Sequence, residues 1–212
     1  ADDRAFQRRY MLEAPLFDSG FRRQTGTLAA DEGIFPTTAE GLAKLKPVKP
    51  NGTHTFGTQT HPADGNAGMI VTTRELARAL STDSAIEVEL LGFGQARVEK
   101  GYMPLAPAPA AQVALKQAGL TIKDVDAVKS HNPFAANDIA FARDTGFPLE
   151  KMNNYGCSLI WGHPQGPTGL RSTIELIEEL VLRGGGVGLF TGCAAGDSGM
   201  ALVLRVREAA RK

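Results

Sequence analysis

The chain has 212 residues, of which 42% are hydrophobic and 22% charged, a composition that can bury the core of one domain or slightly more. Its 23 basic and 23 acidic residues give a formal net charge of zero, which argues against a surface for nucleic acid or anionic membranes. No apolar run approaches the roughly 20 residues of a membrane span, and the charged first residues do not resemble a signal peptide. We therefore expect a protein of the cytoplasm or an organelle matrix, with Cys157 and Cys193 as thiols.

The first 80 residues contain few regular patterns. Residues 3–17 form a charged, helix-like segment that no strand precedes, as expected for a fragment. Residues 18–50 are rich in Gly, Pro and Thr, and their one helical pattern, 37–46, has Thr38 as its expected N-cap. A strand is predicted over 67–73 and a helix over 73–80.

From residue 85 onward, apolar strands alternate with helical patterns, which predicts an α/β fold. In the helix over 168–183, the sequence predicts a buried stripe of Leu170, Ile174, Ile177 and Val181. The charged residues lie mostly away from it, namely Glu175, Glu178, Glu179 and Arg183. The last two strands are joined by a short link, so we expect a layered α/β sandwich whose sheet is mixed. Strands are predicted at 85–94, 125–130, 156–162, 186–192 and 199–206, and helices at 108–120, 134–146 and 168–183.

Four loops at predicted strand ends interrupt this pattern, and each contains a histidine or a cysteine among small residues. They read "GTQTHPADG" (57–65), "SHNPFAAND" (130–138), "GHPQGPTG" (162–169) and "TGCAAGDSG" (191–199). No Cys-x-x-Cys or His-x-x-x-His spacing supports a zinc site, so we expect no metal. A cysteine beside an imidazole fits thiol chemistry, although a buried cysteine and a hydrogen-bonded turn histidine are the ordinary alternatives for Cys193 and His163 taken singly.

Together and in this order, the four loops resemble the C-terminal half of the thiolases, which make or cleave 3-oxoacyl-CoA. "GHPQGPTG" resembles the family's Gly-His-Pro-x-Gly-x-Ser/Thr-Gly block, and "GLFTGCAAGDSG" its closing cysteine block. "TTAEGLAKLKP" with "NGTHTFGTQTHPADGNAG" is similar to the family's coenzyme A loop, and "KQAGLTIKDVDAVKSHNPFAAND" to the stretch that ends in Asn-Glu-Ala-Phe. The resemblance implies that 1–50 is a remnant of the family's loop domain and that 51–212 is its C-terminal domain.

The resemblance implies three catalytic residues. Cys193 would be the acid/base that deprotonates acetyl-CoA or protonates the leaving enolate, and His163 would activate the nucleophile. His131 replaces the asparagine of Asn-Glu-Ala-Phe, as in thiolases of the sterol-carrier-protein type, and would hold a water at the enolate oxygen. Because an amide does not titrate, we expect a His131→Asn variant to stay active with a flatter rate profile between about pH 5.5 and 7.5.

Coenzyme A thioesters would be substrates, and no permanently bound cofactor is implied. The backbone N–H of Ala195 would complete a second oxyanion hole, Thr60 and His61 replace the usual Ser-Gly of the coenzyme loop, and Phe134 would line the pantetheine tunnel. Possible neighbours of the coenzyme phosphates are basic side chains, namely Arg22, Arg23, Lys44, Lys46 and Lys49.

The nucleophilic cysteine of the family lies in an N-terminal half that this chain does not contain. Cys157 falls at a glycine position of the family, so packing is its expected role. We therefore expect a partner that supplies the N-terminal half, within a homo- or hetero-oligomer such as a dimer or tetramer of full units. Two alternatives are a thiolase-fold subunit that binds acyl-CoA without catalysis and a cysteine hydrolase that uses Cys193 and His163.

Overall fold

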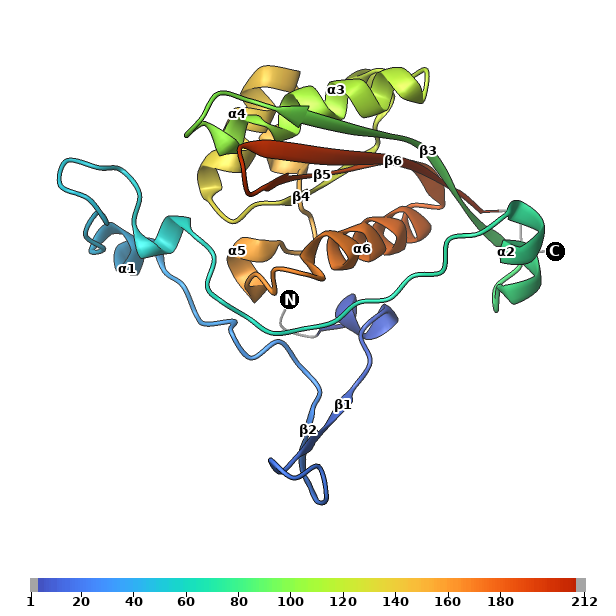
Figure 1. Cartoon of the computed structure of the whole chain (residues 1–212), viewed down its shortest axis with the longest axis horizontal. Coiled ribbons are helices and arrows are strands. Elements are labelled where there is room, and N and C mark those ends of the chain that lie inside the picture. The colour runs from blue at the N-terminus through green and yellow to red at the C-terminus, as the bar shows by residue number, and fades with distance from the viewer. Residues whose placement is uncertain (1–3, 209–212) are drawn as a thin grey trace.

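The computed structural model describes residues 4–208, which form a four-stranded mixed sheet with helices on both faces and a long N-terminal arm (Figure 1). The sheet has the order β3-β6-β5-β4, in which β4 and β5 are parallel and the other pairs antiparallel. Its strands are β3 (Ile86–Arg97), β4 (Ala127–His131), β5 (Gly185–Ala194) and β6 (Ser198–Glu208), and its helices are α3 (Pro107–Gln117), α4 (Ala135–Thr145), α5 (Ser158–Trp161) and α6 (Thr168–Leu182). The predicted α/β sandwich with a mixed sheet is confirmed.

Each face of the sheet has its own apolar core. On one face, α3 and α4 cover the sheet, and α6 lies on the other (Figure 1). The core under α3 is rich in alanine, so helix and strands come close: a Cβ on Gly94 of β3 would lie 2.2 Å from the carbonyl oxygen of Ala110. Leu176 and Leu180 of α6 pack on β5 and β6 across the opposite face.

The outer edge of β4 is covered by a loop instead of a strand. Val128 pairs with Met152 in an isolated parallel bridge, and the N–H of Asn153 donates to the carbonyl of Val128 at 3.0 Å. The next link uses a side chain, because the N–H of Ser130 donates to Oδ1 of Asn153 at 2.8 Å. These bonds hold the end of β4 in position without a further strand.

The N-terminal arm, residues 4–80, has little packing of its own. Between residues 8 and 80 no residue is buried. The arm contains a projecting hairpin and two short helices, and its course passes beside α5 and α6 (Figure 1). These elements are β1 (Ala14–Phe17), β2 (Gln24–Leu28), α1 (Ala39–Ala43) and α2 (Arg74–Leu80). The predicted cap of α1 is confirmed, because the Thr38 side chain accepts a hydrogen bond from the N–H of Gly41.

Three predicted elements are wrong. The segment 3–17 is not a helix: its described residues form a 3₁₀ turn at Gln7–Arg9 and then strand β1. Residues 14–17 form a strand because they pair with β2. Asp3 lies outside the described residues. Residues 67–73 have a strand-like sequence but no strand beside them among residues 4–208, so they form no ladder. The expected strand over 156–162 contains helix α5 instead. No helix within residues 4–208 is long and apolar enough to cross a membrane.

Candidate active site

Two of the four sequence loops meet because their strands are neighbours. His131 ends β4 and pairs with Gly192 in β5, directly before Cys193. The glycine allows a close approach, because a Cβ on Gly192 would lie 3.0 Å from the Cβ of His131. The third loop joins them through His163, whose ring centroid lies 4.2 Å from that of His131.

The fourth loop, which contains Thr60 and His61, connects the other loops through its backbone. The N–H of Thr60 donates to the carbonyl of Pro133 at 2.8 Å, and its hydroxyl donates to the carbonyl of Ser158 at 2.5 Å. The N–H of His163 donates to the carbonyl of His61 at 3.0 Å. The arm therefore contributes this segment to the site.

The hydrogen bonds of Thr168 determine the tautomer of His163. The hydroxyl of Thr168 lies 2.7 Å from the carbonyl oxygen of Pro164, which can only accept, so its single proton is used there. The same hydroxyl lies 2.9 Å from Nδ1 of His163 and must accept from it. His163 thus has its proton on Nδ1 and a free lone pair on Nε2, as a general base requires.

The neighbouring imidazole, His131, is buried, and its Nδ1 lies 3.0 Å from the hydroxyl of Ser158. Burial, and then the charge of His163, lower the pKa of His131 from 6.5 to about 3. Burial also lowers the pKa of His163. The two neighbouring rings are therefore neutral near pH 7, and a proton on one opposes a proton on the other.

This low pKa corrects one expectation. His131 does not titrate between pH 5.5 and 7.5, because burial depresses its pKa to about 3. An asparagine at this position should therefore leave the shape of the rate profile in that range unchanged, and the predicted flattening is withdrawn.

Cys193 lies at the end of β5 and is buried beside the first turn of α4. Nδ2 of Asn137 donates a hydrogen bond to Sγ of Cys193 at 3.4 Å. Burial raises the pKa of the Cys193 thiol, and this hydrogen bond opposes that rise. The sulfur is thus close to a neutral donor and to the positive end of a helix, both of which favour a thiolate.

Ala195 lies in the turn between β5 and β6, two residues beyond Cys193. Its φ is not positive, so the alanine side chain causes no backbone strain there. Its carbonyl accepts from the Ser198 hydroxyl at 3.1 Å.

The proposed coenzyme residues lie around the same loops. Phe134 is half-buried and pairs with Gln59 in an isolated antiparallel bridge. The ring of His61 fills the space between two glycines, since a Cβ on Gly33 would lie 1.9 Å from its Nε2 and one on Gly162 would lie 2.8 Å away. The basic candidates are not brought together, because the hairpin loop with Arg22 and Arg23 and the region of α1 with Lys44, Lys46 and Lys49 lie in separate parts of the arm (Figure 1).

Comparisons with known proteins agree with this arrangement. The family model described as "Thiolase, C-terminal domain" matches residues 84–206. The chain belongs to the thiolase family. An acetyl-CoA acetyltransferase of Syntrophomonas wolfei is 37% identical over 177 residues, which are 82% of this chain and 44% of the relative. The peroxisomal 3-ketoacyl-CoA thiolase B of Rattus norvegicus is 37% identical over 80% of this chain and 40% of its own length.

Solved thiolase structures have the same fold. The Bacillus anthracis acetyl-CoA acetyltransferase superposes with a TM-score of 0.89 at 29% identity, over 97% of this chain and 52% of that protein. The human mitochondrial 3-ketoacyl-CoA thiolase in complex with CoA superposes with a TM-score of 0.74 at 30% identity, over 85% of this chain and 46% of that one. This thiolase chain therefore spans about half the length of the relatives that it matches.

The sequence patterns missed a buried ionic network behind the site. Lys129 of β4 and Glu175 of α6 are fully buried, and their Nζ and Oε2 atoms lie 2.8 Å apart. Glu175 also contacts Arg171 and Tyr10, and Arg171 pairs with Asp31 of the arm at 2.6 Å. The buried face of α6 thus includes Glu175 and Glu179, whereas the predicted stripe is only partly buried (Leu170, Ile174, Ile177 and Val181).

The expectation that Glu175 and Glu179 lie away from the core is wrong because their charges are matched, whereas Ile177 and Val181 of the stripe do pack against the core. Lys129 interrupts an apolar strand sequence, and a lysine there needs a buried carboxylate. Glutamates spaced four apart on α6 reach inward to meet this lysine and Arg183. The lysine inside the predicted strand 125–130 was the available signal.

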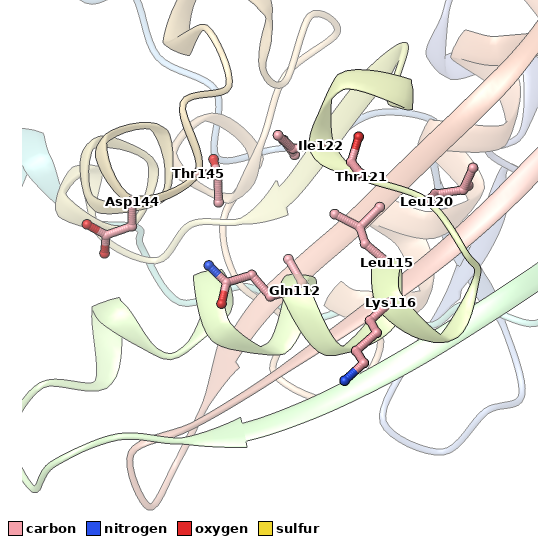
Figure 2. Close-up of a pocket in the computed structure, with 9 residues that line it drawn as sticks. Gln112, Leu115, Lys116, Leu120, Thr121, Ile122, Asp144 and Thr145 are labelled. Atoms are coloured by element: carbon pink, nitrogen blue, oxygen red, sulfur yellow. The ribbon is translucent and has the colours of Figure 1, made fainter.

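A surface pocket of about 340 Å³ between α3 and the end of α4 is separate from these loops (Figure 2). Figure 2 shows Gln112 and Leu115 of α3 on one side and Asp144 and Thr145 of α4 across from them. Its lining contains no histidine or cysteine, so the cluster around Cys193 is the better candidate for chemistry.

Proposed function

We propose that this chain is the C-terminal part of a working thiolase, which condenses two acyl-CoA thioesters or cleaves 3-oxoacyl-CoA. The acyl-carrying cysteine would come from a separate N-terminal half. The observation that carries the proposal is the close pair of His131 and His163 beside the strand end that bears Cys193, with both imidazoles neutral and Nε2 of His163 free to accept a proton.

In this proposal the first half-reaction uses His163. Its Nε2 takes the proton of the partner's thiol as the thiolate attacks the thioester carbonyl. Coenzyme A then leaves with a proton from the Cys193 thiol, which becomes a thiolate. The new Nε2–H can then donate to the thioester oxygen, while Thr168 continues to accept from Nδ1. His131 remains neutral beside the charged ring, which suits a residue that orients a water without exchanging protons.

Cys193 would carry out the proton transfer of the second half-reaction. Its thiolate removes a proton from the α-carbon of acetyl-CoA, and the enolate attacks the acyl group on the partner's cysteine, which leaves as a thiolate. His131 and His163 stabilise the enolate oxygen in this step, and the Ala195 N–H supports the second oxyanion. His131, which stands where the usual motif has an amide, supports a likeness to thiolases of the sterol-carrier-protein type.

An N-terminal partner is supported by apolar surface that residues 4–208 leave uncovered. On β3, Val88, Leu90 and Phe93 are exposed at 40%, 45% and 55%. They pair with Val206, Leu204 and Leu202 of β6, so they share the face on which α6 lies. In the arm, Ile70 and Val71 are exposed at 76% and 66%, within the sequence that predicts a strand.

Cys157 is a poor substitute for the missing nucleophile. It is buried at the N-cap of α5, and burial raises the pKa of its thiol.

Coenzyme A thioesters would bind between Thr60, His61 and Phe134, with no permanently bound cofactor. We assign 1–50 to the loop-domain remnant and 51–212 to the C-terminal domain, in an oligomer of the cytoplasm or an organelle matrix.

The test uses the chain together with an N-terminal thiolase half and compares Cys193→Ser with Cys157→Ser. We expect Cys193→Ser to abolish exchange of the acetyl-CoA α-protons with solvent deuterium, while acyl transfer to the partner's cysteine continues slowly. The Cys157→Ser control should retain both steps. Equal loss of both steps in Cys193→Ser would make that residue structural, and acyl-CoA binding without either step in the unmodified protein would favour a non-catalytic subunit.

A further inference from the structure

Asn137 is the side chain that the structure places directly on the Cys193 sulfur, and no sequence motif identifies it. It lies in the first turn of α4, six residues after His131, and is 2% exposed. Its Nδ2 is 3.4 Å from Sγ of Cys193. Its Oδ1 accepts a hydrogen bond from the backbone N–H of Phe134 at 3.2 Å.

The second of these contacts fixes the direction of the first. A backbone N–H can only donate, so the atom of Asn137 that faces Phe134 is the oxygen. The amide nitrogen must then face Cys193 and offer it an N–H. The cap of α4 therefore determines that the sulfur receives a donor and not an acceptor.

A donor at this position has a direct effect on a residue that alternates between thiol and thiolate. A hydrogen bond from a neutral amide strengthens when its acceptor becomes an anion. The amide does not titrate, so it stays a donor throughout the cycle. Asn137 also adds no charge to a site where a cation would oppose proton uptake by His163.

The other titratable groups near Cys193 do not provide this donor. The rings of His131 in β4 and His163 in the α5–α6 loop lie next to one another at a tilt, and their Nδ1 atoms bond to Ser158 and Thr168. Asp138, next to Asn137 on α4, accepts hydrogen bonds from three other side chains, Ser130, Asn132 and Asn153.

We propose that Asn137 is a positioning residue that holds the Cys193 sulfur by a neutral N–H donor and stabilises its thiolate between the two proton transfers. This proposal rests on the proposed function only for the role of Cys193. The contact itself is independent of substrate and partner.

The experiment measures the rate of Cys193 alkylation by iodoacetamide against pH, in the full chain with Cys157→Ser. The midpoint of this curve reports the thiol–thiolate equilibrium, whereas accessibility changes only the plateau. We expect Asn137→Leu, which has a similar size but no donor, to raise the midpoint by about one pH unit, equivalent to about tenfold less thiolate below the midpoint.

Asn137→Asp separates the sulfur contact from the cap. The carboxylate can still accept from Phe134 but offers no donor and adds a negative charge, so its midpoint should rise at least as far as that of Asn137→Leu. An unchanged midpoint in either folded variant would overturn the proposal, and Asn137→Asp keeps this test available if loss of the cap unfolds Asn137→Leu. Failure of the proposed function would instead appear as proton exchange that survives Cys193→Ser.

Discussion

The C-terminal unit from β3 to β6 and the N-terminal arm differ in how their sequences specify structure. Every residue of β4 is buried, and most elements from β3 onward begin and end near the predicted residues. Between residues 8 and 80 no residue is buried, although that stretch includes exposed Phe21, Phe35 and Phe56. An apolar pattern determines an element when the surface that it packs against belongs to the same chain.

The arm therefore has apolar patterns whose side chains are not buried among residues 4–208. Residues 67–73 have a strand pattern, but a strand needs a neighbour to bond its N–H and C=O groups. In the C-terminal unit the opposite holds, because even the buried charges find partners. Four experiments test this contrast, from the largest expected effect to the smallest.

The largest effect is expected where a buried ion pair is broken. Lys129→Ala leaves the carboxylate of Glu175 buried without its lysine, and should lower the free energy of unfolding by about 3–5 kcal/mol. In the arm, Lys44→Ala breaks the exposed pair with Glu40 and should change it by no more than about 0.5 kcal/mol. Urea denaturation of both variants measures the difference, and equal losses would contradict the contrast.

Acid should destabilise the C-terminal unit through His131. The folded-state pKa of about 3 lies below the unfolded value of 6.5, so the unfolded chain binds a proton first and stability falls as pH drops through this range. From pH 7.5 to 5 the loss from this group should be about 2 kcal/mol. His131→Asn should remove that part of the pH dependence and leave the part due to His163. Unfolding curves of equal pH dependence for the variant and the unmodified chain would show that His131 titrates normally.

Two buried serines offer a matched comparison of smaller size. The Ser158 hydroxyl bonds Nδ1 of His131, whereas the buried Ser172 hydroxyl has no hydrogen-bond partner among the described residues. We expect Ser158→Ala to cost about 1 kcal/mol and to change the nitrogen-15 shifts of His131, because its tautomer loses a partner. Ser172→Ala should change neither, and unaltered imidazole shifts in Ser158→Ala would make that contact incidental.

The smallest effect on folding is expected in the arm. Ile70→Asp alters a side chain that is 76% exposed, so it should change the free energy of unfolding of this chain by less than about 0.5 kcal/mol. If the N-terminal half covers this segment, the same change should weaken assembly with it. Titration calorimetry of the two halves measures the binding, and undiminished affinity would place the interface elsewhere.

The sequence predicted the fold class and most of the sheet, and its resemblance to the thiolases implied that His163 and Cys193 belong to one site. These depend on hydrophobic period and on motifs at strand ends. It could not predict Ser158 or Asn137 as contacts of His131 and Cys193, because such pairs depend on how a helix start is turned toward a strand. It also misplaced Glu175, since a glutamate on a helix is assigned to solvent unless the lysine facing it is known.

The side chain of Asn153 makes the two edges of the sheet different. Its Oδ1 accepts a hydrogen bond from the N–H of Ser130, so the edge along β4 is covered near the candidate site. The edge along β3 pairs with no other strand within residues 4–208 on its outer side. Amide protons should therefore exchange slowly with deuterium at Ser130 and faster along much of the outer side of β3. Strand-to-strand association of this chain in concentrated solution would then begin at β3, away from the candidate catalytic loops.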